Sequence, residues 1–308
     1  MTYLDPNHSE VEDLIGVGSN QRGESFFVDS VNGSNTFTGL TWDTAFATID
    51  YAIGLCTANR GDVIYVSPRH AEAVIAAAGI VCDVAGVSIV GVGVGRARPT
   101  ITFTTAATAD IDIDAANVTF RNLRIVNGIA ALAGGIDVNA AGFSMIDCDF
   151  YCDAAASHVL VMVITDATCN HVEILHCSFN FEFSNAATPI IMTTPSTVAI
   201  RLVGADFARI EDCYISGNFT VAAIDSLTTA CRSVSIIRNF IRNVQTTNIA
   251  GIIDLVAATN GVVAQNQGFH GYVTDLATTI DPASCGMVAN FFSNVVTETG
   301  GLVGTAST

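Results

Sequence analysis

The chain has 308 residues, of which 50% are apolar and 13% are charged, and its formal net charge is −17. All twelve cationic residues are arginines, and this balance of charge would repel a phosphate backbone, which excludes nucleic acid as a partner. No apolar run approaches the roughly 18 residues that a membrane-spanning helix needs, so no membrane partner is expected.

Nine cysteines are spread along the chain, and none has the paired spacing of a zinc site. Core burial is the usual fate of cysteine in a chain too long to be a disulfide scaffold, so we expect mostly free, buried thiols. Cys148 and Cys152 are close enough in sequence to be weighed as a disulfide, and the free form is favoured. The sequence indicates no metal and no cofactor.

Residues 1–25 are interpreted as an N-terminal arm. Acidic residues stand where a secretory signal would need basic ones, and no apolar segment follows them. Export by the secretory route is therefore not predicted.

Residues 26–84 are expected to open and cap the fold. The pattern over 26–68 is strand, turn rich in Gly and Asn, helix, Gly-Asp turn, strand. Thr44 is a plausible N-cap of the helix. The residues that share one apolar face of this helix are Phe46, Ile49, Ile53 and Cys56. An exposed end of stacked strands is a template for aggregation, so we expect this helix to cover it.

Residues 85–292 repeat one pattern at intervals of 24 to 36 residues. Aligned on one position, here called the inner column, the copies contain Val92, Leu123, Cys148, Cys177, Cys213, Asn239, Asn266 and Asn290. The third residue before the column is apolar in all eight copies, and the second residue after it is apolar in seven, from Val94 to Phe292, with Gly268 as the exception. A second short strand, such as IDID at 111–114, lies upstream of each later copy.

This pattern predicts a strand, a one-residue bend and another strand in each copy, with no helix. Such units bury an inner face only by stacking, so we predict an all-β fold, a parallel β-helix with a short N-terminal capping helix. The three successive asparagines are expected to form an internal ladder of side-chain amides. Residues 293–308 are interpreted as a polar C-terminal tail.

Two stretches carry a resemblance to a known family. The segment FFVDSVNGSNTFTGLTWDTAFATIDYAI…GDVIYVSP and the repeats IDIDAANVTFRNLRI and GIDVNAAGFSMIDCDF resemble right-handed parallel β-helix proteins of the pectin-lyase-like superfamily. The resemblance spans about residues 26–292. It implies the right-handed fold without an activity, because that superfamily includes lyases, hydrolases, adhesins and phage virion proteins.

Polar residues precede the inner column by one position and are expected to point outward. They include Asn122, Asp147, His176, Asp212, Arg238 and Gln265. Asp147 and Asp212 would lie two coils apart, roughly 9 to 10 Å between backbones, which suits the two carboxylates of inverting glycoside hydrolysis. The alternative is a solvated ladder of ion pairs in which each link contributes little to stability.

A second set of acidic residues is expected to stack eleven residues before the column. It comprises Asp112, Asp137 and Asp166, with Asp225, Asp254 and Asp281 close to that spacing. Such a ladder could bind calcium, and turn-capping aspartates are the alternative. The pectate-lyase chemistry of the family needs calcium-binding acids beside a base, and here lysine is absent and the arginines of the coils lack a matching acid cluster.

An outward aromatic strip would indicate a sugar-binding adhesin. One position after the column the chain places Tyr214, Phe240 and Phe291, and Asp149, Ser178 and Gln267 interrupt them. No catalytic, cofactor-binding or metal-ligating residue is assigned.

The sequence favours a non-enzymatic structural protein of a virus particle, a phage decoration protein or a head or tail appendage resembling phage virion-associated β-helix proteins. We expect it to reside in the virion as a homotrimer packed against other virion proteins, because so apolar a solenoid suits lateral burial. The alternative is a tailspike-like protein that binds or cleaves a host surface glycan, acting as a glycoside hydrolase through Asp147 and Asp212.

Overall fold

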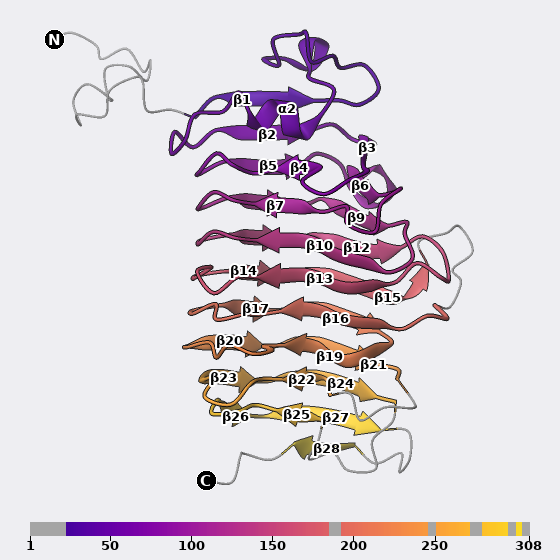
Figure 1. Ribbon diagram of the computed structural model, residues 1–308, viewed down its shortest axis with the longest axis vertical. Coiled ribbons are helices and arrows are strands. Elements are labelled where there is room, and N and C mark those ends of the chain that lie inside the picture. The colour runs from indigo at the N-terminus through magenta and orange to yellow at the C-terminus, as the bar shows by residue number, and fades with distance from the viewer. Residues whose placement is uncertain (1–22, 185–191, 246–250, 272–278, 295–299, 304–308) are drawn as a thin grey trace, which may run out of the picture.

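The protein is a stack of coils built from three parallel sheets. The structure, a computed structural model, describes residues 23–184, 192–245, 251–271, 279–294 and 300–303. Each coil contributes one strand to each sheet in turn, and equivalent strands of successive coils lie one above the other from the N-terminal to the C-terminal end (Figure 1). The all-β, parallel β-helix prediction is confirmed.

The sheets are named A, B and C in the order in which a coil visits them. Sheet A contains β1 (Ser25–Val28), β2 (Val63–Val66), β5 (Ser88–Gly91), β8 (Thr119–Arg121), β11 (Ser144–Ile146), β14 (Glu173–Leu175), β17 (Arg209–Glu211), β20 (Val234–Ile237), β23 (Gly261–Ala264) and β26 (Gly286–Val288). Sheet B contains β3 (Ala71–Val74), β6 (Thr100–Phe103), β9 (Arg124–Asn127), β12 (Asp149–Cys152), β15 (Ser178–Ser184), β18 (Tyr214–Gly217), β21 (Phe240–Asn243), β24 (Gln267–His270), β27 (Asn290–Asn294) and β28 (Gly300–Val303). Sheet C contains β4 (Ile80–Val81), β7 (Ile111–Ile113), β10 (Leu132–Val138), β13 (Val159–Thr165), β16 (Ser196–Arg201), β19 (Phe219–Asp225), β22 (Ile253–Asp254) and β25 (Ile280–Asp281).

The coils start earlier and end later than the repeat alone indicates. β2, β3 and β4 already supply one strand to each sheet, before residue 85. At the other end, β28 pairs antiparallel with β27, so part of the expected C-terminal tail is a strand of sheet B. Of the predicted arm over residues 1–25, residues 1–22 lie outside the described residues and Ser25 begins β1.

The bend between sheets A and B turns on a single left-handed residue, which corresponds to the one extra residue of the predicted pattern. In seven successive coils that residue has a left-handed backbone with φ between 52° and 58°, a conformation that costs a non-glycine residue about 1–2 kcal/mol. These residues, here called the corner row, are Asn122, Asp147, His176, Asp212, Arg238, Gln265 and Ala289. The left-handed bend turns the chain sharply, so the next residue points into the core.

The inner column is buried in those same coils, from Leu123 to Asn290. The assignment of Val92 and Val94 to this pattern is wrong. Between β5 and β6 the chain inserts a loop with a short 3-10 helix (Gly95–Ala97), which leaves Val94 82% exposed. The inward residue of that coil is instead Ile101, which pairs in register with Ile125.

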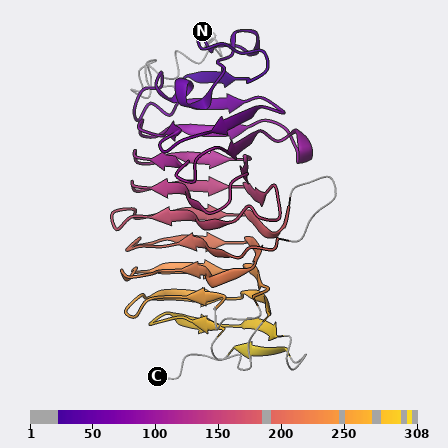
Figure 2. The same ribbon diagram turned by 45° about the vertical axis from the view of Figure 1, so that its right-hand side comes forward.

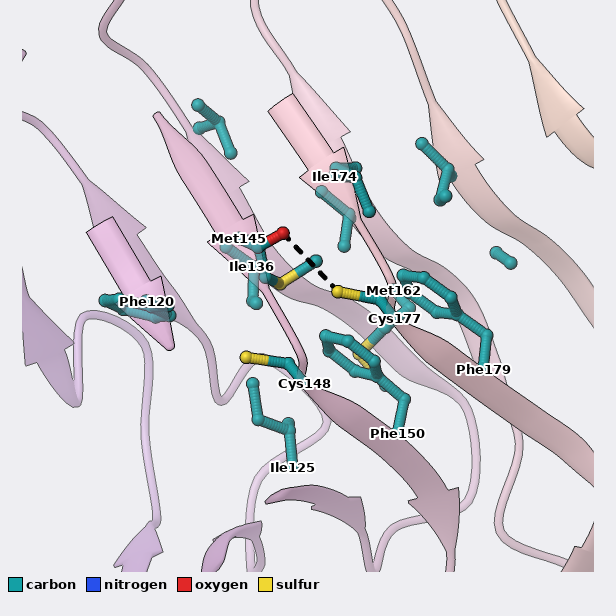
Figure 3. Close-up of a cluster of buried hydrophobic side chains, with 14 of the residues drawn as sticks. Phe120, Ile125, Ile136, Met145, Cys148, Phe150, Met162, Ile174, Cys177 and Phe179 are labelled. Carbon is teal, nitrogen blue, oxygen red and sulfur yellow. Dashed lines mark hydrogen bonds between the residues drawn. The ribbon is translucent and has the colours of Figure 1, made fainter. Parts of the chain in front are cut away.

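Thiols and aromatic rings fill the central coils. Phe150 and Phe179 are neighbours in sheet B and stack face to face with ring centroids 4.3 Å apart (Figure 3). Cys148 and Cys177 lie beside them, and the Cys177 thiol donates to the Met145 carbonyl oxygen at 3.5 Å. All nine cysteines are free, so Cys148 and Cys152 form no disulfide.

Asparagines form the predicted ladder in the last coils. Asn239, Asn266 and Asn290 are fully buried. The Asn266 Oδ1 accepts from the backbone N–H and the side-chain amide of Asn239, both at 3.0 Å. The Asn290 Oδ1 accepts in the same way from the backbone N–H and the side-chain amide of Asn266. Each rung thereby links its coil to the next one.

Gly268, the exception to the apolar pattern, has a steric cause. Its φ is 157°, and a Cβ there would lie 1.6 Å from the carbonyl oxygen of Ile241. Strand β24 passes too close to β21 at this point for any side chain, so an apolar residue cannot occupy the position.

A short helix covers the N-terminal end of sheet C. α2 (Ile49–Ile53) lies near the N-terminal end of the stack (Figure 2) and buries Ile49 and Ile53. The Asp50 carboxylate accepts from the N–H of Val81 in β4, the first strand of that sheet. The capping role is confirmed, but the predicted N-cap is wrong. Thr48 caps the helix by accepting from the Tyr51 N–H, whereas Thr44 lies in a 3-10 helix (Trp42–Thr44). Among the described residues no helix has the length and apolar character to cross a membrane.

Candidate functional site

The corner row carries both carboxylates of the predicted hydrolase pair. Asp212 receives two hydrogen bonds from the Arg238 guanidinium, 2.8 Å from Nε and 2.7 Å from Nη2. The His176 Nε2 lies 3.8 Å from the Asp212 Oδ2. Asp147 is one coil further away and faces Arg121 at 3.6 Å, with both side chains exposed. The row is therefore the ladder of ion pairs that the alternative predicted.

The electrostatics of Asp212 suit a carboxylate and not a proton donor. The hydrogen bond from Arg238 holds the pKa of Asp212 below its ordinary value. Inverting hydrolysis needs one carboxyl of the pair to stay protonated at working pH, through a raised pKa. Asp212 therefore does not supply that protonated carboxyl.

An ion-pair network on the outer face of sheet A adjoins this corner. Arg209 bonds Glu173 at 2.7 Å and Glu211 at 3.1 Å, and the Ser235 hydroxyl donates to Glu211 at 2.8 Å. Burial alone would raise the pKa of Glu211, but the hydrogen bonds from Arg209 and Ser235 lower it overall. Glu173, Glu211 and Ser235 were not predicted from the sequence, although they precede the column by four, two and four residues.

The aromatic residues of the next position form a strip along sheet B. Tyr214 and Phe240 pair in register, and their rings are parallel within 2° with centroids 5.6 Å apart. Gln267 and Phe291 follow in the next two coils. These four residues are here called the rim row. Tyr214, Phe240 and Phe291 are 41%, 43% and 48% exposed, so the predicted interrupted strip is present.

A groove of about 560 Å³ lies between the corner row and the rim row near the C-terminal end. Its lining comprises Arg238, Asn239, Phe240, Gln265, Gln267 and Ala289. At Ala289 the corner carries only a methyl group, whereas the two corners before it carry the longer side chains of Arg238 and Gln265. Phe240, Gln265 and Gln267 line the groove together with this small residue.

The predicted acidic row is present on sheet C, but other residues interrupt it. Asp112 and Asp137 pair in register, as do Asp225, Asp254 and Asp281. Between the two groups stand Ile164 and Arg201.

Asp166 does not belong to this row, because the turn after Ile164 is longer in that coil. Thirteen residues separate Ile164 from Cys177, where eleven separate Asp112 from Leu123. Asp166 instead caps its turn by accepting from the backbone N–H of Thr168 at 2.6 Å and from its hydroxyl at 2.8 Å.

The two ends of the acidic row differ in how their charge is balanced. Burial and the nearby Asp110, Asp114 and Asp137 raise the pKa of Asp112 to about 6. Asp225, by contrast, is held by Arg201, with a shortest contact of 2.6 Å to the Nη2. Within the described part of the chain, no group of three or more His, Cys, Asp or Glu side chains is arranged to hold a metal ion.

Comparison with known proteins supports the fold. No protein-family model and no curated protein matches the chain. Among solved structures, it is similar to the pectate lyase Pel9A with a TM-score of 0.57 and 10% identity, over 90% of this chain and 78% of that one. A rhamnogalacturonan lyase matches with a TM-score of 0.46 and 12% identity, over 87% of each chain. A GH136 lacto-N-biosidase from Eubacterium ramulus matches with a TM-score of 0.45 and 10% identity, over 89% of this chain and 64% of that one. The likeness to the pectate lyase confirms the right-handed parallel β-helix fold, and at such low identity it shows the fold alone.

Proposed function

We propose that this protein binds a neutral glycan in the groove between the corner row and the rim row. The observation that carries the proposal is the exposed Tyr214–Phe240 pair beside a groove of about 560 Å³ lined by Gln265 and Gln267. Aromatic rings offer apolar surface to the C–H face of a sugar, and side-chain amides both donate to and accept from its hydroxyls.

The solved structures that resemble the chain favour a glycan over a virus-particle role. Pel9A is named for its action on pectate, and this chain shares its fold along most of its length. A structural role in a virion, with homotrimer packing against other virion proteins, stays a prediction from the sequence.

The charges around the groove favour a neutral ligand. Arg238 is committed to Asp212 through two hydrogen bonds and lies 3.3 Å from Glu211. With a net charge of −17, the chain as a whole repels polyanions. Acidic polysaccharides are therefore expected to bind more weakly than neutral ones.

Binding without cleavage is the form of the function that the geometry supports. The pKa of Asp212 is lowered by Arg238, so this carboxyl is not set up as a general acid. We expect no release of reducing ends from a bound polysaccharide. Release that falls sharply in Asp212→Asn would instead establish the hydrolase alternative.

Isothermal titration calorimetry with soluble glucans, mannans and xylans tests the proposal. Phe240→Ala removes the central ring of the strip and is expected to lower affinity about tenfold. Phe37→Ala is the matched control, because Phe37 is 44% exposed and lies on the N-terminal cap, far along the chain from the groove. Unchanged affinity in Phe240→Ala would contradict the location, and a loss in Asp254→Asn would place the site on sheet C.

A further inference from the structure

The rim row is aligned with the long axis of the solenoid. Its four residues stand directly above one another in β18, β21, β24 and β27, one in each coil (Figure 1). Strands paired in parallel repeat at about 4.8 Å, so the row repeats at nearly the length that one sugar adds to an extended glycan.

The row alternates apolar and polar contacts in a fixed order. Tyr214 and Phe240 give two adjacent rings, Gln267 interrupts them, and Phe291 gives a third ring. The side-chain amides of Gln267 and Gln265 are exposed and form no hydrogen bond with another described residue. They are free to bond ligand hydroxyls on either side of one coil.

The cations beside the row are already engaged. The Arg238 guanidinium is paired with Asp212, and the guanidinium of Arg242 lies 5.5 Å from the ring centroid of Phe269 in the next coil. A ligand that follows the row therefore meets rings and amides without meeting an uncommitted charge, which selects hydroxyl groups over carboxylates.

From these observations we infer that the ligand is a linear, neutral, extended glycan that lies parallel to the solenoid axis, with one sugar over each of Tyr214, Phe240, Gln267 and Phe291. This inference rests on the proposed function and adds the direction and the chain length of the ligand. An extended chain of β-linked sugars can stay on a straight row of equally spaced contacts, whereas a chain that coils leaves it.

Titration with cello-, manno- and xylo-oligosaccharides of two to six sugars tests the arrangement, with malto-oligosaccharides as the coiling comparison. Affinity is expected to rise about threefold or more with each added sugar up to four and then to level off, since later sugars lie beyond the row. Malto-oligosaccharides of the same lengths are expected to bind more weakly.

Phe291→Ala sharpens the test because it removes one end of the row. We expect it to lower the affinity for four sugars to the value for three and to leave the affinity for two unchanged, while Phe37→Ala changes neither. If polysaccharides bind but affinity does not depend on length, or Phe291→Ala has no effect, the lengthwise arrangement is wrong and the proposed function stands. If no glycan binds at all, both are overturned.

Discussion

The inner column changes its chemistry along the solenoid. In the middle coils it consists of Cys148, Cys177 and Cys213, packed among phenylalanines, and in the last coils it consists of amides. Both kinds of side chain donate to the same backbone carbonyl, that of the residue three positions before the column in the preceding coil. The Cys213 thiol reaches the carbonyl oxygen of Ile174 at 3.4 Å, and the Asn239 amide reaches that of Ile210 at 2.9 Å.

The difference lies in the acceptor. Each asparagine Oδ1 also accepts from the coil before it, as Asn239 does from the Cys213 N–H at 2.9 Å, and a thiol forms only a weak acceptor. Where apolar side chains fill the core well, as at the Phe150–Phe179 stack, a small buried thiol in the column is enough to hold the coils together. The last coils have less of this packing, because Gly268 has no side chain and the strands β22 and β25 of sheet C are only two residues long. There the hydrogen bonds of the asparagine ladder hold the coils together.

The largest expected effect comes from a substitution that breaks the asparagine ladder of the last coils. Asn266→Leu keeps the size of the side chain but removes the acceptor of the Asn239 N–H and side-chain amide and the amide that donates to the Ile236 carbonyl. The Asn290 Oδ1 keeps only the backbone N–H of residue 266. Each buried group left unsatisfied costs about 1–3 kcal/mol, so we expect a loss of roughly 3–5 kcal/mol in the free energy of unfolding. Urea denaturation followed by circular dichroism measures it.

Cys177→Ala is the matched substitution in the middle coils, where the column consists of cysteines. It removes one sulfur atom and a weak hydrogen bond, and we expect a loss of about 1–2 kcal/mol. Equal losses in the two variants would show that the amide ladder adds nothing beyond packing.

The sequence allowed the repeat, the one-residue bend and the asparagine ladder to be predicted, because each depends on residue type at one fixed position. It failed where the number of residues in a turn changed. The loop before Thr100 displaced Val94, and the longer turn after Ile164 displaced Asp166, since a single sequence does not reveal where an insertion lies.

The groove could not be predicted for a different reason. Phe240 and Gln267 were visible as neighbours in the repeat, but the groove depends on how side chains of three coils, from Arg238 to Ala289, fill the space between them. Volume that is missing leaves no pattern in hydropathy, so the strip was visible and the groove was not.

The N-terminal and C-terminal parts of the solenoid also differ on the outer face of sheet C. Asp112 has no arginine beside it in its row, and its pKa is about 6, above the ordinary 3.8. A carboxyl with a raised folded pKa favours the folded state below about pH 4, and this contribution is lost as the pH rises through 6. Asp112→Asn is therefore expected to stabilise the protein at pH 7.5, by roughly 1 kcal/mol after allowing for solvent screening.

The gain of Asp112→Asn should shrink towards zero at pH 4.5, which thermal unfolding at both pH values measures. Asp83→Asn removes an equally negative side chain from an exposed position and serves as the control. A gain that is the same at both pH values would mean that the charge of Asp112 is not what destabilises this end of the row.

The smallest expected effect is the most direct test of the comparison between thiols and amides. In Cys213→Asn the new amide can donate to the Ile174 carbonyl, which the Cys213 thiol now reaches, and its Oδ1 can accept from the Cys177 N–H. The position is already followed by Asn239, so the ladder would gain one rung at its N-terminal end. We expect the free energy of unfolding to change by less than about 1 kcal/mol, because a satisfied buried amide contributes little net free energy. Cys148→Asn, which stands three coils from Asn239, the nearest asparagine of the column, and beside Phe150, has no such continuation and should cost more. If urea denaturation gives equal losses for the two variants, thiols and amides are not interchangeable at the column, and the boundary between the halves is set by packing alone.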